Sequence, residues 1–465
     1  MRVERVLPSS PVASFDEYRE RAGGGAAIER AVELGPLGVL EELRASGLRG
    51  RGGGGFPTGA KWTGVRNEPG RRRFVVCNGA EGEPATFKDR TILRTNPYAV
   101  VEGLIVAAHT IGAEGAYIAV KASFTQEIDA LTRAITEMQS AGLCTDCTIS
   151  IVHGPDEYLF GEEKALLEVV EGNAPLPRLL PPYQHGLFAS APQTGWAATT
   201  VDDRARGIQE SNPTLVNNVE TLAHVPGILT NGAAWFREHG TAESPGTIVC
   251  TFVGDVARAA VGEVAMGTTL REAMEEIANG PLGGSFKAAF SGVANPVVTA
   301  DLLDTPLAYE TFAAAGTGLG AAGFFVLDEE ACMVEAVRQI SRFLYVESCG
   351  QCPPCKRGSG EITDRLRDIE AAAGSDRHID DLRYWLDRVT DGNRCYLAVE
   401  ERETVASVLR AFPEEFADHI ASGRCPRPKP IPLPKVVDIR DGVAVYDESH
   451  YRKQPDWTYV APPVS

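Results

Sequence analysis

The chain has 465 residues and a formal net charge of −18, with 43% hydrophobic and 23% charged residues. This composition is typical of a folded chain of two to four domains, and the acidic balance argues against nucleic-acid binding, which needs a basic face. Charged residues interrupt the longest apolar stretch, residues 99–122, which argues against a membrane span. The N-terminus has no signal-type apolar core, so we expect a cytoplasmic protein that reaches a membrane face only through partner subunits.

A glycine-rich segment, GLRGRGGGGFPTGAKW, follows a predicted helix over residues 26–43 that is broken at Gly35-Pro36. Six glycines lie between Gly50 and Gly59, with arginine and lysine beside them. Glycine lets the backbone approach a ligand closely and point amide groups at an anion. Residues 50–55 formally fit the G-x-G-x-x-G dinucleotide fingerprint, but that pattern alone is weak and no clear strand precedes it. The alternative is a flexible loop, which the flanking cations make less favourable.

The next stretch alternates predicted strands and helices. Strands are expected over residues 73–78, 115–121 and 148–153, and helices over 96–110 and 126–141. This alternation predicts a parallel sheet in an α/β domain. The first strand leads into NGAEGEPATFKDR, residues 78–90, and ligands gather at the carboxyl ends of such strands. The pair Cys144 and Cys147 has no second pair nearby, and we interpret it as incidental.

Two adjacent acidic residues occur in YLFGEEKAL, residues 158–166. Buried carboxylates can bind ribose hydroxyls and would repel a 2′-phosphate, which favours NADH over NADPH. The alternative is an ordinary helix start, where acidic residues complement the helix dipole, and on these residues alone that alternative is the stronger. Residues 187–211 are polar and irregular and predict a loop insertion.

Residues 245–327 predict a second, smaller domain. Strands are expected over residues 246–254, 262–266 and 324–327, and a helix over 269–277 that is capped after Thr268. A second G-x-G-x-x-G pattern, residues 318–323, precedes a strand and follows none. That order is wrong for a dinucleotide-binding turn, so we expect a simple turn.

The chain's most specific motif is ESCGQCPPCK, residues 347–356, which holds Cys349, Cys352 and Cys355. Cys395 lies 40 residues beyond the last of them. Three close thiolates and a distant fourth favour a [4Fe–4S] cluster, whereas structural zinc more often uses two separated pairs. Helices predicted over residues 329–345, 360–373, 376–390 and 400–412 would form a four-helix bundle around it.

Cys425 is a fifth candidate ligand, but it lies beyond Cys395. Residues 426–465 are rich in proline and have no helical period. We expect either a strap across the surface or a docking arm.

Five segments of the chain resemble one known family: the ESCGQCPPC motif, the glycine-rich segment and residues 78–90, 158–166 and 212–222. That family contains the NADH-binding flavoprotein (51 kDa) subunit of respiratory complex I. It also contains the related diaphorase subunits of NAD-reducing hydrogenases and formate dehydrogenases. The resemblance implies an α/β fold. A Rossmann-like FMN- and NADH-binding domain (1–240) would precede a ubiquitin-like β-grasp (SLBB) domain (241–328), a four-helix iron–sulfur domain (329–425) and a proline-rich tail (426–465).

The same resemblance implies the site residues. The [4Fe–4S] ligands would be Cys349, Cys352, Cys355 and Cys395. The catalytic carboxylates would be Glu81 and Glu163, which position and tune the cofactors because hydride transfer needs no protein acid or base. FMN and NADH would contact Gly52, Gly53, Gly54, Gly55, Phe56, Lys61, Asn78, Glu81, Glu83, Tyr158, Gly161, Glu162, Glu163, Tyr183, Asn217 and Asn218.

Two positions depart from the family pattern. Ala80 stands where the family has an acid, and Ala85 where it has a glycine. The form of this segment also resembles the soluble subunit of Rnf-type ferredoxin:NAD oxidoreductases.

A nucleotide pocket and a one-electron cluster in one chain imply a flavin between them, because NADH gives up two electrons together. We therefore expect an NADH dehydrogenase subunit whose partner is a small [2Fe–2S] subunit or another redox subunit. The alternatives are a flavin-less electron relay or scaffold, and a diaphorase linked to Rnf, formate or hydrogen.

Overall fold

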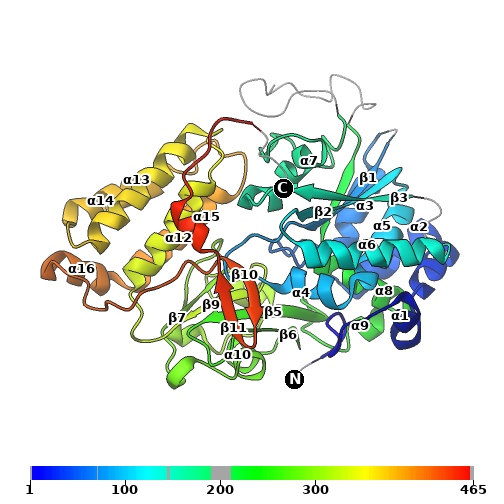
Figure 1. Cartoon of the computed structure of the whole chain (residues 1–465), viewed down its shortest axis with the longest axis horizontal. Coiled ribbons are helices and arrows are strands. Elements are labelled where there is room, and N and C mark those ends of the chain that lie inside the picture. The colour runs from blue at the N-terminus through cyan, green and yellow to red at the C-terminus, as the bar shows by residue number, and fades with distance from the viewer. Residues whose placement is uncertain (1–2, 71, 144–146, 190–210, 461–465) are drawn as a thin grey trace.

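The computed structural model describes residues 3–70, 72–143, 147–189 and 211–460. Figure 1 shows an α/β region built from the first half of the chain, a smaller β-rich region and a helical region, with the C-terminal segment crossing between them. Cys144 and most of the predicted 187–211 insertion lie outside the described residues. No helix of the described chain is both long and apolar enough to cross a membrane.

The first sheet has four parallel strands in the order β3-β2-β1-β4. The predicted parallel sheet is confirmed, and three strands lie where the alternation placed them: β1 (Phe74–Gly79), β2 (Gly115–Lys121) and β3 (Thr148–Gly154). The fourth strand, β4 (Thr214–Asn218), was not predicted, because five residues that end in two asparagines have little strand signal. β1 and β4 pair in register and end side by side at Asn78 and Asn218.

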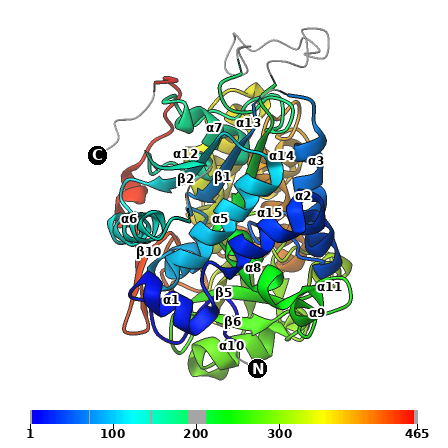
Figure 2. The same cartoon turned by 90° about the vertical axis from the view of Figure 1, so that its right-hand side faces the viewer.

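The two faces of this sheet bury different helices. Val75 and Cys77 of β1 pack in the larger core, with helices α2 (Ala26–Ser46), α5 (Pro97–Ile111) and α8 (Val219–Asn231). Figure 2 shows these helices in front of β1 and β2. Phe74 and Val76 point to the other face, where α7 (Glu163–Val170) covers them, because successive strand residues face opposite sides. The predicted break in α2 is confirmed at Gly35, whose φ is 64°.

Further helices complete this region. They are α1 (Phe15–Ala22), α3 (Thr58–Asn67), α4 (Lys88–Thr95), α6 (Thr125–Ser140) and α9 (Ala233–Phe236), with the short 3-10 helix η1 (Tyr158–Gly161) before α7.

The second sheet is mixed, in the order β6-β5-β9-β7-β8, and α10 (Leu270–Ala278) packs on it. Its strands are β5 (Thr247–Gly254), β6 (Ala260–Ala265), β7 (Ala288–Ser291), β8 (Val298–Thr299) and β9 (Gly323–Leu327), with α11 (Tyr309–Ala314) beside them. This arrangement matches the expected ubiquitin-like domain. The predicted cap of α10 was one residue early, because Thr269 itself forms the capping box with Glu272.

Five helices form the third region. The predicted four are confirmed as α12 (Met333–Glu347), α13 (Pro353–Glu370), α14 (Asp376–Leu386) and α15 (Leu397–Ala411), and α16 (Pro413–Ser422) follows them. Three starts were misplaced, that of α15 by three residues. α12 begins at Met333 because the Cys332 side chain caps it, and α13 begins at Pro353, within the cysteine motif, because proline suits the first turn of a helix.

The C-terminal segment is a strap. It forms the hairpin β10 (Val436–Arg440) and β11 (Val443–Tyr446), drawn in red in Figure 1, and then the 3-10 helix η7 (Glu448–Arg452). Arg90 of the α/β region donates to the carbonyl of Val436 at 2.5 Å. Trp457 Nε1 donates to the carbonyl of Ser348 at 2.8 Å, beside the cysteine motif. The strap therefore joins the first and third regions.

Candidate functional site

A cavity of about 630 Å³ lies at the carboxyl ends of β1 and β4. All three regions of the chain form its wall. The α/β region contributes Gly52, Gly53, Gly54, Asn78, Ala80, Glu81, Gly82, Glu83, Thr86, Asp89, Tyr158, Leu159, Gly161, Glu162 and Asn218; the β-rich region contributes Ala294, Asn295, Gly320 and Ala321; the helical region contributes Tyr396, Leu397 and Glu400. We call it the flavin pocket below.

The glycine loop forms one side of the flavin pocket with backbone alone. Gly53 has a φ of 111°, which favours glycine, and its backbone lies against Gly320 and Ala321. A Cβ at Gly52 would lie 3.1 Å from the side chain of Asn218, whereas a Cβ at Gly54 would meet nothing within 4 Å. The loop therefore leaves the space beside Gly54 open for a ligand that approaches the main chain.

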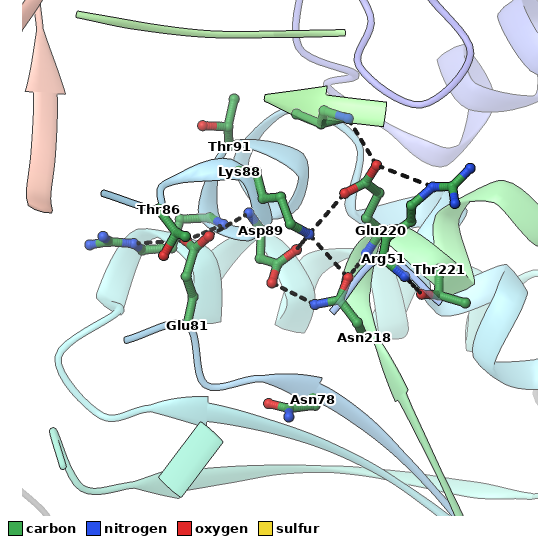
Figure 3. A network of polar contacts seen from close by, with 12 residues as sticks. Arg51, Asn78, Glu81, Thr86, Lys88, Asp89, Thr91, Asn218, Glu220 and Thr221 are labelled. Atoms are coloured by element: carbon green, nitrogen blue, oxygen red, sulfur yellow. Dashed lines mark hydrogen bonds and ion pairs between the residues drawn. The ribbon is translucent and has the colours of Figure 1, made fainter. Parts of the chain in front are cut away.

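A buried network of charges holds the pocket floor, as Figure 3 shows. Lys88 Nζ lies 2.7 Å from Asp89 Oδ1 and 2.8 Å from Glu220 Oε2, and all three side chains are buried. Asn218 joins the network by donating to Asp89 Oδ2 at 2.6 Å. Burial alone would raise the pKa of Glu220, but Lys88 and His224 lower it to about 2. The network thus fixes Asn218, at the end of β4, against α4.

Arg51 ties the glycine loop to this network. Its backbone N–H donates to Thr221 Oγ1 at 2.8 Å, and its guanidinium lies 4.0 Å from Glu220 Oε1 (Figure 3). The guanidinium also donates to the carbonyls of Thr247 and Pro245 in the β-rich region. Arg51 is therefore a fully buried structural residue rather than a free cation for a phosphate.

Three carboxyl groups in the wall have pKa values near neutrality. Burial raises the pKa of Glu83 to about 7, that of Glu162 to about 7 and that of Glu400 to about 8. Tyr158 donates its hydroxyl to Glu400 at 3.1 Å, and Glu162 caps α7 by accepting from Ala165 N at 2.9 Å. Both interpretations of the EE pair therefore apply to Glu162, which caps a helix and also lines the pocket.

Glu81 and Asn78 lie in the wall but are already partnered. Glu81 accepts from the backbone amide of Asp89 at 3.1 Å and pairs with Arg90 at 3.4 Å. Asn78 donates to the carbonyl of Gly161 at 2.8 Å. These bonds orient the two side chains at the start of α4 and the end of β1.

Six predicted cofactor residues do not line the pocket: Gly55, Phe56, Lys61, Glu163, Tyr183 and Asn217. Asn217 points into the core, where it accepts from Trp62 Nε1 at 2.6 Å, so its side chain is used by the fold. Lys61 and Glu163 form an ion pair of 2.8 Å on half-exposed side chains. Phe56 and Tyr183 are 59% and 43% exposed, which leaves both rings available to a ligand at the surface.

Sequence reasoning missed wall residues that come from the other two regions. Gly320 and Ala321 belong to the second G-x-G-x-x-G segment, which is a turn as predicted but also faces the glycine loop. Tyr396, Leu397 and Glu400 directly follow Cys395, and that adjacency is the one sequence signal that could have placed them near a cofactor.

A second cavity holds the four predicted cluster cysteines. Cys349, Cys352, Cys355 and Cys395 line it together with apolar residues that include Leu159, Leu397 and Ala398. Burial raises the pKa of the Cys355 thiol to about 12 and that of Cys395 well above its usual range. Thiolates in such surroundings need a cationic centre beside them, which iron supplies. We call this the cluster cavity.

Glu347 anchors the cluster loop to its neighbours. It accepts from Tyr158 N at 2.9 Å, from His450 Nε2 at 3.0 Å and from Lys453 Nζ at 2.7 Å. Burial would raise the pKa of Glu347, but the bond from His450 and the charge of Lys453 hold it well below its usual range. One carboxylate therefore connects η1, the strap and the cysteine motif.

The flavin pocket and the cluster cavity are neighbours. Leu159 and Leu397 line both of them. These two apolar side chains therefore belong to a wall that the two cavities share.

The residues present fit the expected cofactors. The open glycine loop is a cradle for an anionic phosphate, and the polar wall can bond a flavin's ribityl chain and ring. Four converging thiols are the donor set of a [4Fe–4S] cluster. Outside the pocket, the exposed Phe56 ring and the Lys61–Glu163 pair lie at the surface near the glycine loop.

Comparison with known proteins indicates the same cofactors. The family model described as the Nuo51 FMN-binding domain matches residues 43–227, and the one described as the NADH-ubiquinone oxidoreductase-F iron-sulfur binding region matches residues 335–419. The F 2 subunit of the NADH-quinone oxidoreductase of Rhizobium meliloti (strain 1021) is 37% identical over 420 residues, which cover 88% of this chain and 94% of that protein.

Hydrogenase subunits are also similar. NADP-reducing hydrogenase subunit HndC of Solidesulfovibrio fructosivorans is 32% identical over 89% of this chain and 82% of its own length. The crystal structure of an NAD⁺-reducing [NiFe]-hydrogenase in the H₂-reduced state superposes with a TM-score of 0.75 at 30% identity, over 90% of this chain and 68% of that one. These matches confirm the predicted oxidoreductase class and its cofactors FMN, NADH and a [4Fe–4S] cluster. The chain belongs to the family of F subunits of NADH-quinone oxidoreductases.

Proposed function

We propose that this chain oxidises NADH at the flavin pocket and passes the electrons through the cluster cavity to a separate [2Fe–2S] protein. When bound, FMN would supply the acceptor for a hydride from NADH, and a [4Fe–4S] cluster held by Cys349, Cys352, Cys355 and Cys395 would supply an acceptor for single electrons. The observation that carries the proposal is that Leu159 and Leu397 belong to the walls of both cavities.

The protein's own groups have positioning roles in this proposal. Gly52, Gly53 and Gly54 hold the phosphate end of the flavin by their backbone, and Asn218, fixed by Lys88 and Asp89, bonds its polar chain. Glu83, Glu162 and Glu400 keep protons near neutral pH and can donate hydrogen bonds into the pocket. Phe56 stacks on NADH, and the carboxylate of Glu163 disfavours NADPH by repelling its extra phosphate.

The partner is proposed from exposure at the cluster end. Tyr396, next to Cys395, is 57% exposed, so an electron reaching the cluster lies close to the surface. The hydrogenase and quinone oxidoreductase relatives are named as subunits, which is consistent with transfer to another subunit. NADH-dependent reduction of an added [2Fe–2S] ferredoxin would support this partner class, and reduction of ferricyanide but of no iron–sulfur protein would contradict it.

A steric block tests the flavin pocket. A Cβ at position 54 would meet no protein atom within 4 Å and would enter the open space beside the loop, so Gly54→Leu should lose FMN and lower NADH:ferricyanide activity by at least about tenfold. Gly64→Leu, on an exposed face of α3 where a Cβ also meets nothing, is the matched control and should keep both. Full flavin content and activity in Gly54→Leu would refute the assignment of this cavity.

A further inference from the structure

A second group of possible metal ligands lies outside the two cavities described above. Cys332, His419 and Cys425 bring one ligand atom each to a common point, and the three atoms all lie within 4.8 Å of one another. Cys332 and His419 are buried, and Cys425 is half-buried. Among the described residues, this is the one group of three or more histidine, cysteine or acidic side chains that converges so closely.

The geometry of the group matches one kind of ion. Cys332 Sγ lies 3.5 Å from His419 Nε2. In a tetrahedral zinc site, bonds of about 2.3 Å to sulfur and about 2.0 Å to nitrogen place these two atoms about 3.5 Å apart. Two thiolates and an imidazole suit zinc, whereas calcium and magnesium prefer oxygen and a cubane cluster takes four thiolates.

The surroundings orient the ligands. His419 Nδ1 lies 2.7 Å from the carbonyl of Glu415, so its proton belongs on Nδ1 and the lone pair of Nε2 faces Cys332. Cys332 caps α12, and its sulfur accepts from the amide of Glu335 at 3.4 Å, a contact that favours a thiolate. The bond from His419 Nδ1 to the Glu415 carbonyl is typical of metal-binding histidines, in which the ring nitrogen that does not bind the metal donates to a backbone carbonyl.

We propose that Cys332, His419 and Cys425 bind one Zn²⁺ ion, with water in the fourth tetrahedral position. The site would join three segments: the start of α12, the end of α16 and Cys425, the residue from which the strap leaves. It is separate from the cluster cavity, because α12, with 15 residues, spans about 22 Å between Cys332 and the cysteine motif. Its role is structural, holding the base of the strap on the helical region.

The metal content of the purified holoprotein tests this site. Elemental analysis should find about one zinc beside about four iron atoms per chain. Zinc K-edge absorption, which does not detect iron, should show two sulfur neighbours at about 2.3 Å and nitrogen or oxygen at about 2.0 Å. Protein from zinc-supplemented cells that contains no zinc, or zinc with four sulfur neighbours as expected for occupation of the cluster cavity, would overturn the proposal.

Single substitutions assign the ligands. Cys425→Ser and His419→Ala should each lower zinc content at least about tenfold while iron and flavin content, which report folding, stay at wild-type values. Cys147→Ser, which removes a partly exposed thiol elsewhere, should keep its zinc. Zinc retained in both ligand variants, or a Cys332–Cys425 disulfide detected by mass spectrometry in the isolated protein, would refute the site.

If both variants fail to fold, chelation of the wild-type protein decides. Zinc removed by a chelator while iron and flavin remain bound should speed hydrogen exchange in the hairpin of residues 436–446. Unchanged exchange in that hairpin after complete zinc removal would contradict the structural role.

Discussion

The flavin pocket and the cluster cavity share two leucines but are stabilised in different ways. The flavin pocket is surrounded by charged groups that other protein groups already satisfy, with Lys88 between Asp89 and Glu220 at its floor. The cluster cavity is lined by four cysteines together with apolar and polar residues, and burial disfavours the thiolate form of Cys355 and Cys395. The first site is preformed by the protein, whereas the second requires its iron. Flavin binding and cluster binding should therefore fail independently.

Removing one cluster thiol gives the largest expected effect. Cys355→Ala should lose the cluster and lower NADH-dependent ferredoxin reduction at least about 100-fold, because a cubane needs four thiolates. FMN should stay bound and NADH should still bleach it, since none of the four thiols lines the flavin pocket. Iron analysis and the visible spectrum measure both. Cys250→Ala, which removes another buried thiol in β5, is the control. If Cys355→Ala loses its flavin while Cys250→Ala keeps it, the two sites do not fail independently.

A substitution in the floor of the flavin pocket should remove FMN instead of the cluster. Lys88→Met leaves Asp89 buried without its cation and Glu220 with only the more distant Arg51, and we expect a loss of about 3–5 kcal/mol in the free energy of unfolding, with loss of FMN. Lys429→Met also removes a lysine between two carboxylates, Asp255 and Asp328, but on a partly exposed side chain, so it should cost about 1 kcal/mol or less. Denaturant unfolding distinguishes the two. Equal losses would contradict a special role for the buried network.

The pocket carboxyls predict a pH dependence of the flavin-free protein. Folding raises the pKa of Glu83, Glu162 and Glu400 from about 4.5 to between about 7 and 8, so the native state holds protons that the unfolded chain has released. Their contribution to stability is complete below pH 4.5 and is lost as the pH rises to 8. Melting temperature should therefore fall between pH 6 and pH 8.5.

Removing one of these carboxyls should reduce that pH dependence. Glu400→Gln should lessen the fall in melting temperature, while Glu41→Gln, on an exposed position of α2, should leave it unchanged. An identical pH profile in Glu400→Gln and wild type would contradict the assignment to this group.

A glycine substitution at the end of α13 should change the stability of the helical region only, and by a small amount. Ala372 follows the end of α13 with a φ of 58°, a conformation that costs alanine about 1 kcal/mol relative to glycine. Ala372→Gly should raise the stability of the transition in which cluster absorbance is lost by about 0.5–1 kcal/mol. Ala45→Gly, at an exposed position in the last turn of α2, should destabilise instead, by up to about 1 kcal/mol. Destabilisation by Ala372→Gly would contradict this reason.

Local sequence patterns predicted the fold well where the elements are long. Strand β2 has its predicted bounds, and α5 and α6 differ from prediction by one residue at their ends. The cysteine spacing predicted which four thiols would share a cavity. These features depend on neighbouring residues, so a single sequence carries them.

The rest depends on contacts between distant segments. The sequence could not indicate that Gly320 would face Gly53. More than 260 positions separate the two glycines, and they meet through their backbones, without side chains. It could not separate Asn217 from Asn218 either. β4 turns alternate residues to opposite sides, so Asn217 bonds Trp62 in the core while Asn218 faces the pocket. Alternation assigns such a pair only once the register of the sheet is known.

The most direct test of electron flow between the two cavities is an anaerobic NADH titration followed by visible spectroscopy, with and without FMN. In the holoprotein, the flavin band and the broad iron–sulfur absorbance should both decrease. In protein stripped of FMN but retaining its iron, NADH should leave the cluster oxidised, and added FMN should restore its reduction. Cluster reduction by NADH without flavin, or a cluster that stays oxidised after FMN is rebound, would contradict transfer from the flavin pocket to the cluster cavity.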